Sequence, residues 1–420
     1  MGKFLSRIFI GALVSFYLFP TGFYFLPAGV NTKMVAAVIG AVAFVLECVP
    51  KGGIPTTKQM LGTVSIALFF SFICFYSTDY NRTDDYSYAT YIVSFFVWLS
   101  AAYGVGKVIR LEHGRFDFTL LTYYLAGVCF AQCVLALMID EIEPFKNIVD
   151  TYIRQGQEFM DEIDRLYGIG ASLDPAGIRF SVVLILISVL LCHSDYVRSR
   201  KKVISALVIS FFVIAVVGNM IARTTSVGAL MALGYFVMFS GILSLTLKGR
   251  YFKFYFIFST LLIAAVIVSA ILYNVDETFH KHLRFAFEGF FSWVETGEWS
   301  TSSTDKLNTM WIWPEDTKTW LIGSGIFGHF IYSTDIGYCR FILYCGIIGF
   351  SSFALFFIYN AVSFWRRNRE IKWLFIFLLA LTFIIWLKVA TDIFFIYALF
   401  YSLDSFDLSY RNRMFNVDRK

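Results

Sequence analysis

The chain has 420 residues, of which 58% are hydrophobic, 19% are aromatic and only 15% are charged, and its mean hydropathy is +0.67. Soluble domains carry about 25% charged residues, so this composition excludes a water-soluble enzyme or binding module. The formal net charge of +5 does not indicate a nucleic-acid partner, because the basic residues cluster between apolar runs, as the topology of a membrane protein requires.

The apolar residues recur in runs long enough to cross a bilayer. Runs of about 17–25 residues match a hydrocarbon core about 30 Å thick. Backbone groups in lipid need partners within their own segment, and the runs lack the alternation of barrel strands, so we expect helices. We predict an all-α, polytopic transmembrane helical bundle of about 12 spans, with residues 1–420 forming a single integral membrane domain. The expected spans lie near residues 4–28, 34–50, 60–77, 87–109, 117–139, 177–194, 202–222, 225–247, 252–274, 337–362, 371–388 and 390–404.

Lysine and arginine residues predict how these spans are oriented. With Lys3 and Arg7 on the inside, alternate connections along the chain carry every basic cluster, and the C-terminal tail is basic as well. The opposite side receives acidic connections such as residues 79–86 and 140–150. We therefore expect an even number of spans, a retained first span rather than a removed signal peptide, and both termini in the cytoplasm.

Two outward loops are too long to be simple connectors. The first, residues 140–177, has apolar residues at helical spacing from Phe145 to Leu166, which predicts an amphipathic helix in the membrane interface. The second, residues 275–337, is rich in phenylalanine and tryptophan, which indicates that it packs on the membrane surface.

Several charged residues on the outward side are not explained by topology. Arg165 follows the amphipathic segment, Arg179 opens the sixth span, and Arg223 lies in the turn between the seventh and eighth spans. Asp335 and Arg340 lie at the start of the tenth span. Charges near the membrane core tend to face a cavity or each other. We hypothesise that the arginines converge on one outward cavity and bind a phosphate-bearing ligand, since guanidinium groups grip phosphate oxygens bidentately.

Some of these residues have an equally simple structural interpretation. Arg179 alone is as well explained by a side chain that extends to the lipid headgroups. For Arg223 we favour a functional interpretation, because a turn this short has little room for a charged side chain that has no role. His329, in the second long loop, is either a general base or a solvated loop residue.

No metal or cofactor site is predicted. His280 and His282 have no acidic pair at suitable spacing, and the seven cysteines include no C-x-x-C pair. The glycine-rich segment 320–329 is not a P-loop, because no Lys-Ser or Lys-Thr follows it. Its glycines indicate a tight outward turn instead.

Three ordered stretches resemble the O-antigen polymerase and O-antigen ligase superfamily of bacterial surface-polysaccharide assembly. Residues 165–168 (RLYG) and 173–175 (LDP) are similar to the family's Arg-x-x-Gly and Asn/Asp-Pro motif before a span. Residues 222–228 (ARTTSVG) are similar to its Ser-Arg-Ser/Thr turn. Residues 323–325 (GSG), 334–338 (TDIGY) and 346–349 (GIIG) are similar to its third signature. The resemblance covers about residues 120–350; each motif alone is weak, and their order is what makes the set specific.

The resemblance implies a metal-independent glycosyltransferase in the bacterial inner membrane. The implied substrate is a polyprenyl-pyrophosphate-linked oligosaccharide, which is transferred onto a sugar hydroxyl of another lipid-linked repeat unit at the periplasmic face, as in O-antigen or capsule synthesis. Arg165, Arg179, Arg223 and Arg340 would bind the pyrophosphate, and Asp335 or His329 would act as the base. Membrane lipids and a chain-length regulator are the further expected partners, and the aromatic residues of the second loop either stack on sugars or anchor in the interface.

Two alternatives remain open at this point. One is an O-antigen ligase that transfers the glycan to a lipid A-core acceptor; the absence of a His-Asn pair at Asp335 weakly favours a polymerase. The family often has an arginine before a tryptophan of the second loop, where this chain has Lys306 before Trp311. The other alternative is a flippase or transporter of lipid-linked oligosaccharides, although the two halves of the chain show no internal repeat.

Overall fold

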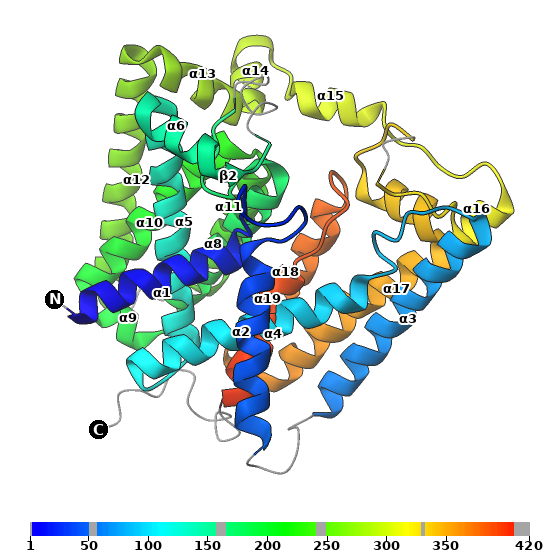
Figure 1. Ribbon diagram of the computed structural model, residues 1–420. Helices are drawn as coiled ribbons and strands as arrows, with labels where there is room; N and C mark the ends of the chain where they lie inside the picture. The colour runs from blue at the N-terminus through cyan, green and yellow to red at the C-terminus, as the bar shows by residue number, and fades with distance from the viewer. Residues whose placement is uncertain (1, 50–56, 157–164, 241–248, 329–331, 407–420) are drawn as a thin grey trace. The chain divides into compact units, whose positions relative to one another are not determined.

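Figure 1 shows a computed structural model that describes residues 2–49, 57–156, 165–240, 249–328 and 332–406. In these ranges the regular structure is helical except for two short strands, β1 (Gly22–Phe23) and β2 (Ile153–Arg154), which pair antiparallel. Seven of the described helices are long and apolar enough to cross a membrane. The all-α membrane architecture is therefore confirmed, while the number of about twelve spans stays a prediction.

The residues form two compact units. Unit 1 contains α1 (Gly2–Leu18), β1, α5 (Phe118–Glu141), α6 (Glu143–Tyr152), β2, α8 (Leu173–His193), α9 (Asp195–Ser199), α10 (Lys201–Ile221), α11 (Thr224–Phe239), α12 (Gly249–Val275) and α13 (Glu277–Ala286). Unit 2 contains α3 (Lys58–Asn81), α15 (Ser302–Asn308), α16 (Thr317–Ile322), α17 (Gly337–Arg367), η3 (Arg369–Ile371) and α18 (Lys372–Ile385). Helices α2 (Thr32–Cys48), α4 (Tyr91–His113), α14 (Glu288–Thr296) and α19 (Phe394–Phe406) have residues in both units.

We call these seven described helices the membrane-crossing helices because of their length and composition, and they follow the predicted apolar runs. They are α3, α4, α5, α8, α10, residues Tyr255–Val275 of α12, and α17. Shorter apolar helices cover Phe4–Leu18, Thr224–Phe239 and Phe394–Ser405.

The first predicted span, residues 4–28, is too long. Helix α1 ends at Leu18, and Pro20, which has no backbone N–H to continue a helix, follows within two residues. The chain then forms β1, in which Gly22 lies opposite Arg154 and Phe23 lies opposite Ile153 of β2. The apolar residues beyond Pro20 therefore belong to a connection rather than to the helix.

The amphipathic helix expected from Phe145 to Leu166 is also too long. Helix α6 ends at Tyr152, and the next two residues form β2. Residues 157–164 of the expected helix lie outside the described ranges. Arg165 itself lies in a segment without regular structure that leads to α8.

The core of unit 1 is α8, the most completely buried of the membrane-crossing helices. A helix that is apolar on every side belongs inside a bundle, and α8 packs against α5, α10 and α11. The contact with α11 is close: a Cβ at Gly228 would lie 2.1 Å from the Cα of Ser181. Small residues thus let the two backbones touch, as is common between helices in membranes.

The core of unit 2 is built from aromatic rings around α17, which packs against α3, α16 and α18. Phe353 on α17 stacks on Phe70 of α3 with ring centres 4.5 Å apart, and on Trp386 at 5.5 Å. The buried indole of Trp386 donates its N–H to the carbonyl oxygen of Thr391 at 2.7 Å. The indole N–H is therefore satisfied within the protein, as burial in lipid requires.

Candidate functional site

In unit 1, Arg223 lies in the turn that joins α10 to α11. The turn is fixed against α8, because the hydroxyl of Ser181 donates to the carbonyl oxygen of Thr224 at 3.0 Å. A Cβ at Gly177 on α8 would lie 2.8 Å from the Cβ of Ala222. Close helix packing therefore sets the position from which the Arg223 side chain extends.

Two of the four predicted arginines meet over one aromatic ring. The guanidinium carbon of Arg165 lies 4.8 Å from the ring centre of Phe285 on α13, and that of Arg223 lies 4.3 Å from it. A guanidinium group is attracted to the negative face of an aromatic ring, and the attraction strengthens where water is excluded. The Phe285 ring thus contacts two positively charged side chains from distant parts of the sequence. We call Arg165 and Arg223 the arginine pair.

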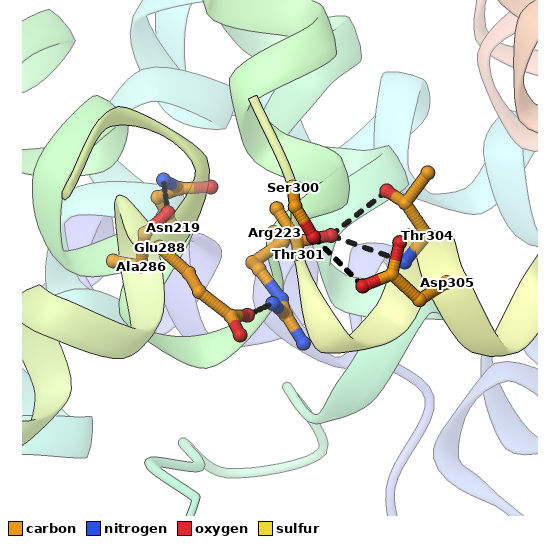
Figure 2. Close-up of polar contacts among 8 residues, drawn as sticks. All are labelled: Asn219, Arg223, Ala286, Glu288, Ser300, Thr301, Thr304 and Asp305. Atoms are coloured by element: carbon orange, nitrogen blue, oxygen red, sulfur yellow. Dashed lines mark hydrogen bonds and ion pairs between the residues drawn. The ribbon is translucent and has the colours of Figure 1, made fainter. Parts of the chain in front are cut away.

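The start of α14 lies beside Arg223, and in Figure 2 the side chain of Glu288 points toward the guanidinium group. Arg223 donates through Nη1 to the carboxylate of Glu288 on α14, and this ion pair is only partly exposed. The side-chain amide of Asn219, at the end of α10, donates to the carbonyl oxygen of Ala286 at 2.7 Å. This bond holds the junction of α13 and α14 against α10, and with it Phe285 and Glu288.

The surroundings of Arg165 disfavour its positive charge. Burial lowers the pKa of the guanidinium, the charge of Arg223 lowers it further, and the carboxylate of Asp174 acts in the opposite direction. Arginine stays protonated at neutral pH regardless. The downward shift means that nearby carboxylates compensate the Arg165 charge incompletely, so a bound anion would be stabilised at the arginine pair.

Arg179 has different neighbours. Its Nη1 donates to the carbonyl oxygen of Pro175, one turn earlier in α8, at 2.6 Å. It also interacts electrostatically with Tyr17 on α1 and Cys129 on α5. These contacts are with the bundle around α8, so they do not include the ring that organises the arginine pair.

In unit 2, Arg340 lies in the first turn of α17 and holds the end of the glycine-rich segment. Its Nη2 donates to the carbonyl oxygen of Phe327 at 2.7 Å, and its guanidinium carbon lies 4.2 Å from the Phe327 ring centre. The side chains of Asp335 and Asp85 are close enough to interact with it electrostatically.

Asp85, which nothing in the sequence indicated, organises the same segment. Its carboxylate accepts the backbone N–H of Phe327 at 2.6 Å and that of Gly328, and it also accepts from Ser87. Burial raises the pKa of this carboxyl, but the hydrogen bonds from Gly328, Ser87 and Phe327 together bring it below its ordinary value. The carboxylate form is therefore the one that the segment binds.

The other end of the glycine-rich segment rests on a break in α17. At Gly346 the backbone has φ +66°, which interrupts the helix. The carbonyl oxygens of Leu343 and Tyr344, just before the break, accept the N–H groups of Ser324 at 2.7 Å and Gly325 at 3.0 Å. The segment thus supplies partners for backbone groups that the break would otherwise leave without them.

Asp335 is exposed immediately before α17, between two buried residues. The Thr334 hydroxyl donates to the carbonyl oxygen of Met310 at 2.6 Å and accepts the N–H of Ile336 at 3.2 Å. The backbone on both sides of Asp335 is fixed, while its carboxylate stays accessible. His329, the other predicted base, lies outside the described residues.

Unit 1 also contains an acid–base contact that the sequence did not predict. His282 on α13 is 5% exposed, and its Nε2 lies 3.3 Å from Oδ2 of Asp140 near the end of α5. The two residues are 142 positions apart, so no local spacing could have indicated the contact. It joins α13, which carries Phe285, to a membrane-crossing helix.

Comparisons with known proteins found no match: no family model, no curated protein and no solved structure matches this chain. The resemblance to the O-antigen polymerase and ligase superfamily therefore rests on the ordered motifs of the sequence. What the site does is inferred from those motifs together with the geometry around the arginine pair.

Proposed function

We propose that the chain is a membrane glycosyltransferase that polymerises oligosaccharides carried on polyprenyl pyrophosphate. In this proposal it works at the periplasmic face of a bacterial inner membrane, with both termini in the cytoplasm. The observation that carries the proposal is the arginine pair over Phe285, where the surroundings of Arg165 leave its charge incompletely compensated.

The proposed chemistry needs stabilisation of a leaving group. A sugar hydroxyl of the acceptor attacks the anomeric carbon of the donor, and the bond from that carbon to the pyrophosphate oxygen breaks. The negative charge that develops on the pyrophosphate is stabilised by guanidinium groups already held in place. Arg223 pairs with the carboxylate of Glu288, and in the proposed complex a phosphate oxygen would replace that carboxylate. The proton of the attacking hydroxyl passes to Asp335 or His329, as the family resemblance implies.

The test is polymer formation by the purified protein in detergent micelles, supplied with the host's own polyprenyl-pyrophosphate-linked repeat unit. We expect Arg165→Ala and Arg223→Ala each to lower the rate on the order of 100-fold, the usual effect of removing one preorganised donor. Arg223→Lys keeps the charge but not the bidentate geometry, so an intermediate loss is expected. Lys281→Ala, at an exposed position of α13, is the matched control.

Micelles have no two sides, so a flippase has no function in this assay, whereas a transferase does. Absence of any polymer with the wild-type protein and the correct repeat unit would refute the transferase proposal. Normal polymerisation by both alanine variants, with unchanged folding, would instead show that the arginine pair is not the pyrophosphate site.

A further inference from the structure

Three tryptophan residues of unit 2 lie next to one another and are too exposed to serve as core residues. Ring centres of Trp311 and Trp313 are 5.8 Å apart with an angle of 33° between the planes. Those of Trp313 and Trp320 are also 5.8 Å apart, and their planes are nearly parallel at 10°. The three side chains are 43%, 41% and 37% exposed. We call Trp311, Trp313 and Trp320 the tryptophan platform.

The outward direction of these rings is built into the backbone. Residues 310–314 have no regular secondary structure, and their exposure alternates from one residue to the next. Met310 and Pro314 are buried and Ile312 is half-buried, while Trp311 and Trp313 between them are exposed. Met310 and Ile312 pack into an apolar cluster with Ile336, Cys339 and Leu343 at the start of α17. The smaller apolar side chains thus fill the core, and the largest ones face outward.

The third ring is held on a short, well-anchored helix. Helix α16 begins after Asp316, whose carboxylate accepts the N–H of Thr319 at 2.9 Å, and it packs against α17 and α3. Trp320 therefore keeps a fixed position relative to Trp313. A rigid aromatic surface binds with little loss of conformational entropy.

The charges beside the platform indicate which ligand suits it. Glu315 and Asp316, both exposed, lie in the sequence between Trp313 and Trp320. Lys318 lies there as well, but its ammonium group donates to the side-chain oxygen of Asn81. Hydrogen bonds from Thr319 hold the pKa of Asp316 below its ordinary value, so this carboxylate is ionised at neutral pH. Two carboxylates repel anionic lipid headgroups, which are bound by clusters of lysine and arginine. They accept hydrogen bonds well from the hydroxyl groups of a sugar.

We propose that the tryptophan platform binds the glycan chain, with sugar C–H faces on the indole rings and hydroxyl groups on Glu315 and Asp316. The pyranose face is apolar and its rim is polar, which matches exposed indole rings with carboxylate acceptors nearby in the chain. This inference rests on the proposed function for the identity of the glycan: the platform holds sugars away from the reacting bond.

Binding is tested with oligosaccharides released by mild acid from the host's surface polysaccharide, added to the protein in lipid nanodiscs. Saturation-transfer NMR reports which sugar C–H groups lie on the protein, and calorimetry gives Kd. We expect Trp311→Ala/Trp313→Ala to weaken binding about tenfold or more, since aromatic contacts act additively over two rings. The double substitution to phenylalanine should retain most of the affinity. Trp299→Ala, at a 70% exposed position of the same loop, should change nothing.

A membrane-anchoring role for the same rings is the competing outcome. Nanodiscs with bromine on the lipid acyl chains quench tryptophan fluorescence only where indoles enter the bilayer. Markedly weaker quenching in the double alanine variant than in the wild type would overturn the proposal, as would unchanged glycan affinity in that variant. If the platform binds glycan but the wild-type protein forms no polymer, the platform proposal holds and the transferase proposal fails. If the wild type forms polymer but the double alanine variant binds glycan as tightly as the wild type, the transferase proposal holds and the platform proposal fails.

Discussion

A single carboxylate connects two distant parts of unit 2 at the level of individual residues. Asp85 accepts two successive N–H groups, of Phe327 and Gly328, from a segment 242 and 243 positions away. Thr83, in the same connection, donates to the carbonyl oxygen of Gly325 at 2.7 Å. The connection between α3 and α4 therefore fixes both the donors and the acceptors of the glycine-rich segment, and through Phe327 it fixes Arg340.

The substitution Asp85→Asn tests this role. An amide oxygen is a weaker acceptor than a carboxylate, so we expect a loss of about 1–2 kcal/mol in unfolding free energy, after allowance for partial exposure. Thermal unfolding in detergent at neutral pH measures it. Asp84→Asn, at the exposed neighbouring position, removes the same charge and should have little effect. Equal losses in the two variants would mean that net charge, and not the contact with the segment, is responsible.

The pH dependence of this difference has a definite sign. The pKa of Asp85 is lowered in the folded protein, so its contribution to stability is present above the ordinary aspartate value of about 3.9 and declines as pH falls through the folded value. The stability gap between wild type and Asp85→Asn should therefore be full at pH 7 and should close in acid. A gap that widened on acidification would contradict the assignment.

The predicted arginines illustrate what a sequence reveals about single residues. Arg165 and Arg223 were identified because topology does not explain a charge at an outward span end, and the structure brings both over Phe285. Phe285 itself was one aromatic residue among many in its loop, and nothing local distinguished it. Asp85 gave no signal either, since an acidic residue in an outward connection is already explained by topology.

At the level of elements, the break in α17 is the feature with the largest structural consequence. Gly346 has φ +66°, and a Cβ there would lie 2.2 Å from the carbonyl oxygen of Leu321. Gly346→Ala would therefore combine an unfavourable left-handed conformation with a collision against backbone, which cannot move aside as a flexible side chain can. We expect a loss of about 1–3 kcal/mol from the conformation alone, and more from the collision.

A matched control separates this effect from helix propensity. Gly127 in α5 has nothing within 4 Å of an added Cβ, so Gly127→Ala should be neutral or stabilising by about 0.5–1 kcal/mol. The unfolding midpoint in detergent is the measurement for both. A Gly346→Ala protein as stable as wild type would show that α17 can straighten without losing its contacts with the glycine-rich segment.

Helix positions were predictable and several helix ends were not. Runs of apolar residues determine where a chain can lie in lipid, so the membrane-crossing helices follow them. Helix α1 ends at Leu18, before Pro20, and α6 ends at Tyr152, where β2 pairs with β1 across 130 and 132 positions of sequence. Periodicity within a window contains no information about such long-range pairing, which is why the expected amphipathic helix is too long.

For the whole molecule, the cysteines offer a direct test of orientation. All seven are buried, in both units. A membrane-impermeant maleimide should therefore leave the wild-type protein unlabelled in right-side-out spheroplasts. Asn308→Cys, at an exposed position of the second long loop, should be labelled from outside. Ser199→Cys, at the exposed end of α9, should be labelled only after the membrane is permeabilised. Labelling of Ser199→Cys in intact spheroplasts would reverse the predicted topology.

Composition alone indicated a membrane protein, and the helical architecture agrees with it. The number of spans is harder to predict, because short apolar helices such as Thr224–Phe239 and Phe394–Ser405 are below the length that guarantees a crossing. Whether such a helix crosses depends on its neighbours, and composition does not specify these.

The two glycines at the break in α17 also constrain how this motif can be moved between proteins. A Cβ at Gly323 would lie 2.1 Å from the carbonyl oxygen of Tyr344, just as one at Gly346 would meet that of Leu321. Each glycine leaves space for the backbone that flanks the other glycine, so the close contact between the two segments needs both. Grafting the segment into another membrane protein therefore requires residues 321–325 and 343–346 together, because they form one structural motif although a loop separates them in the sequence.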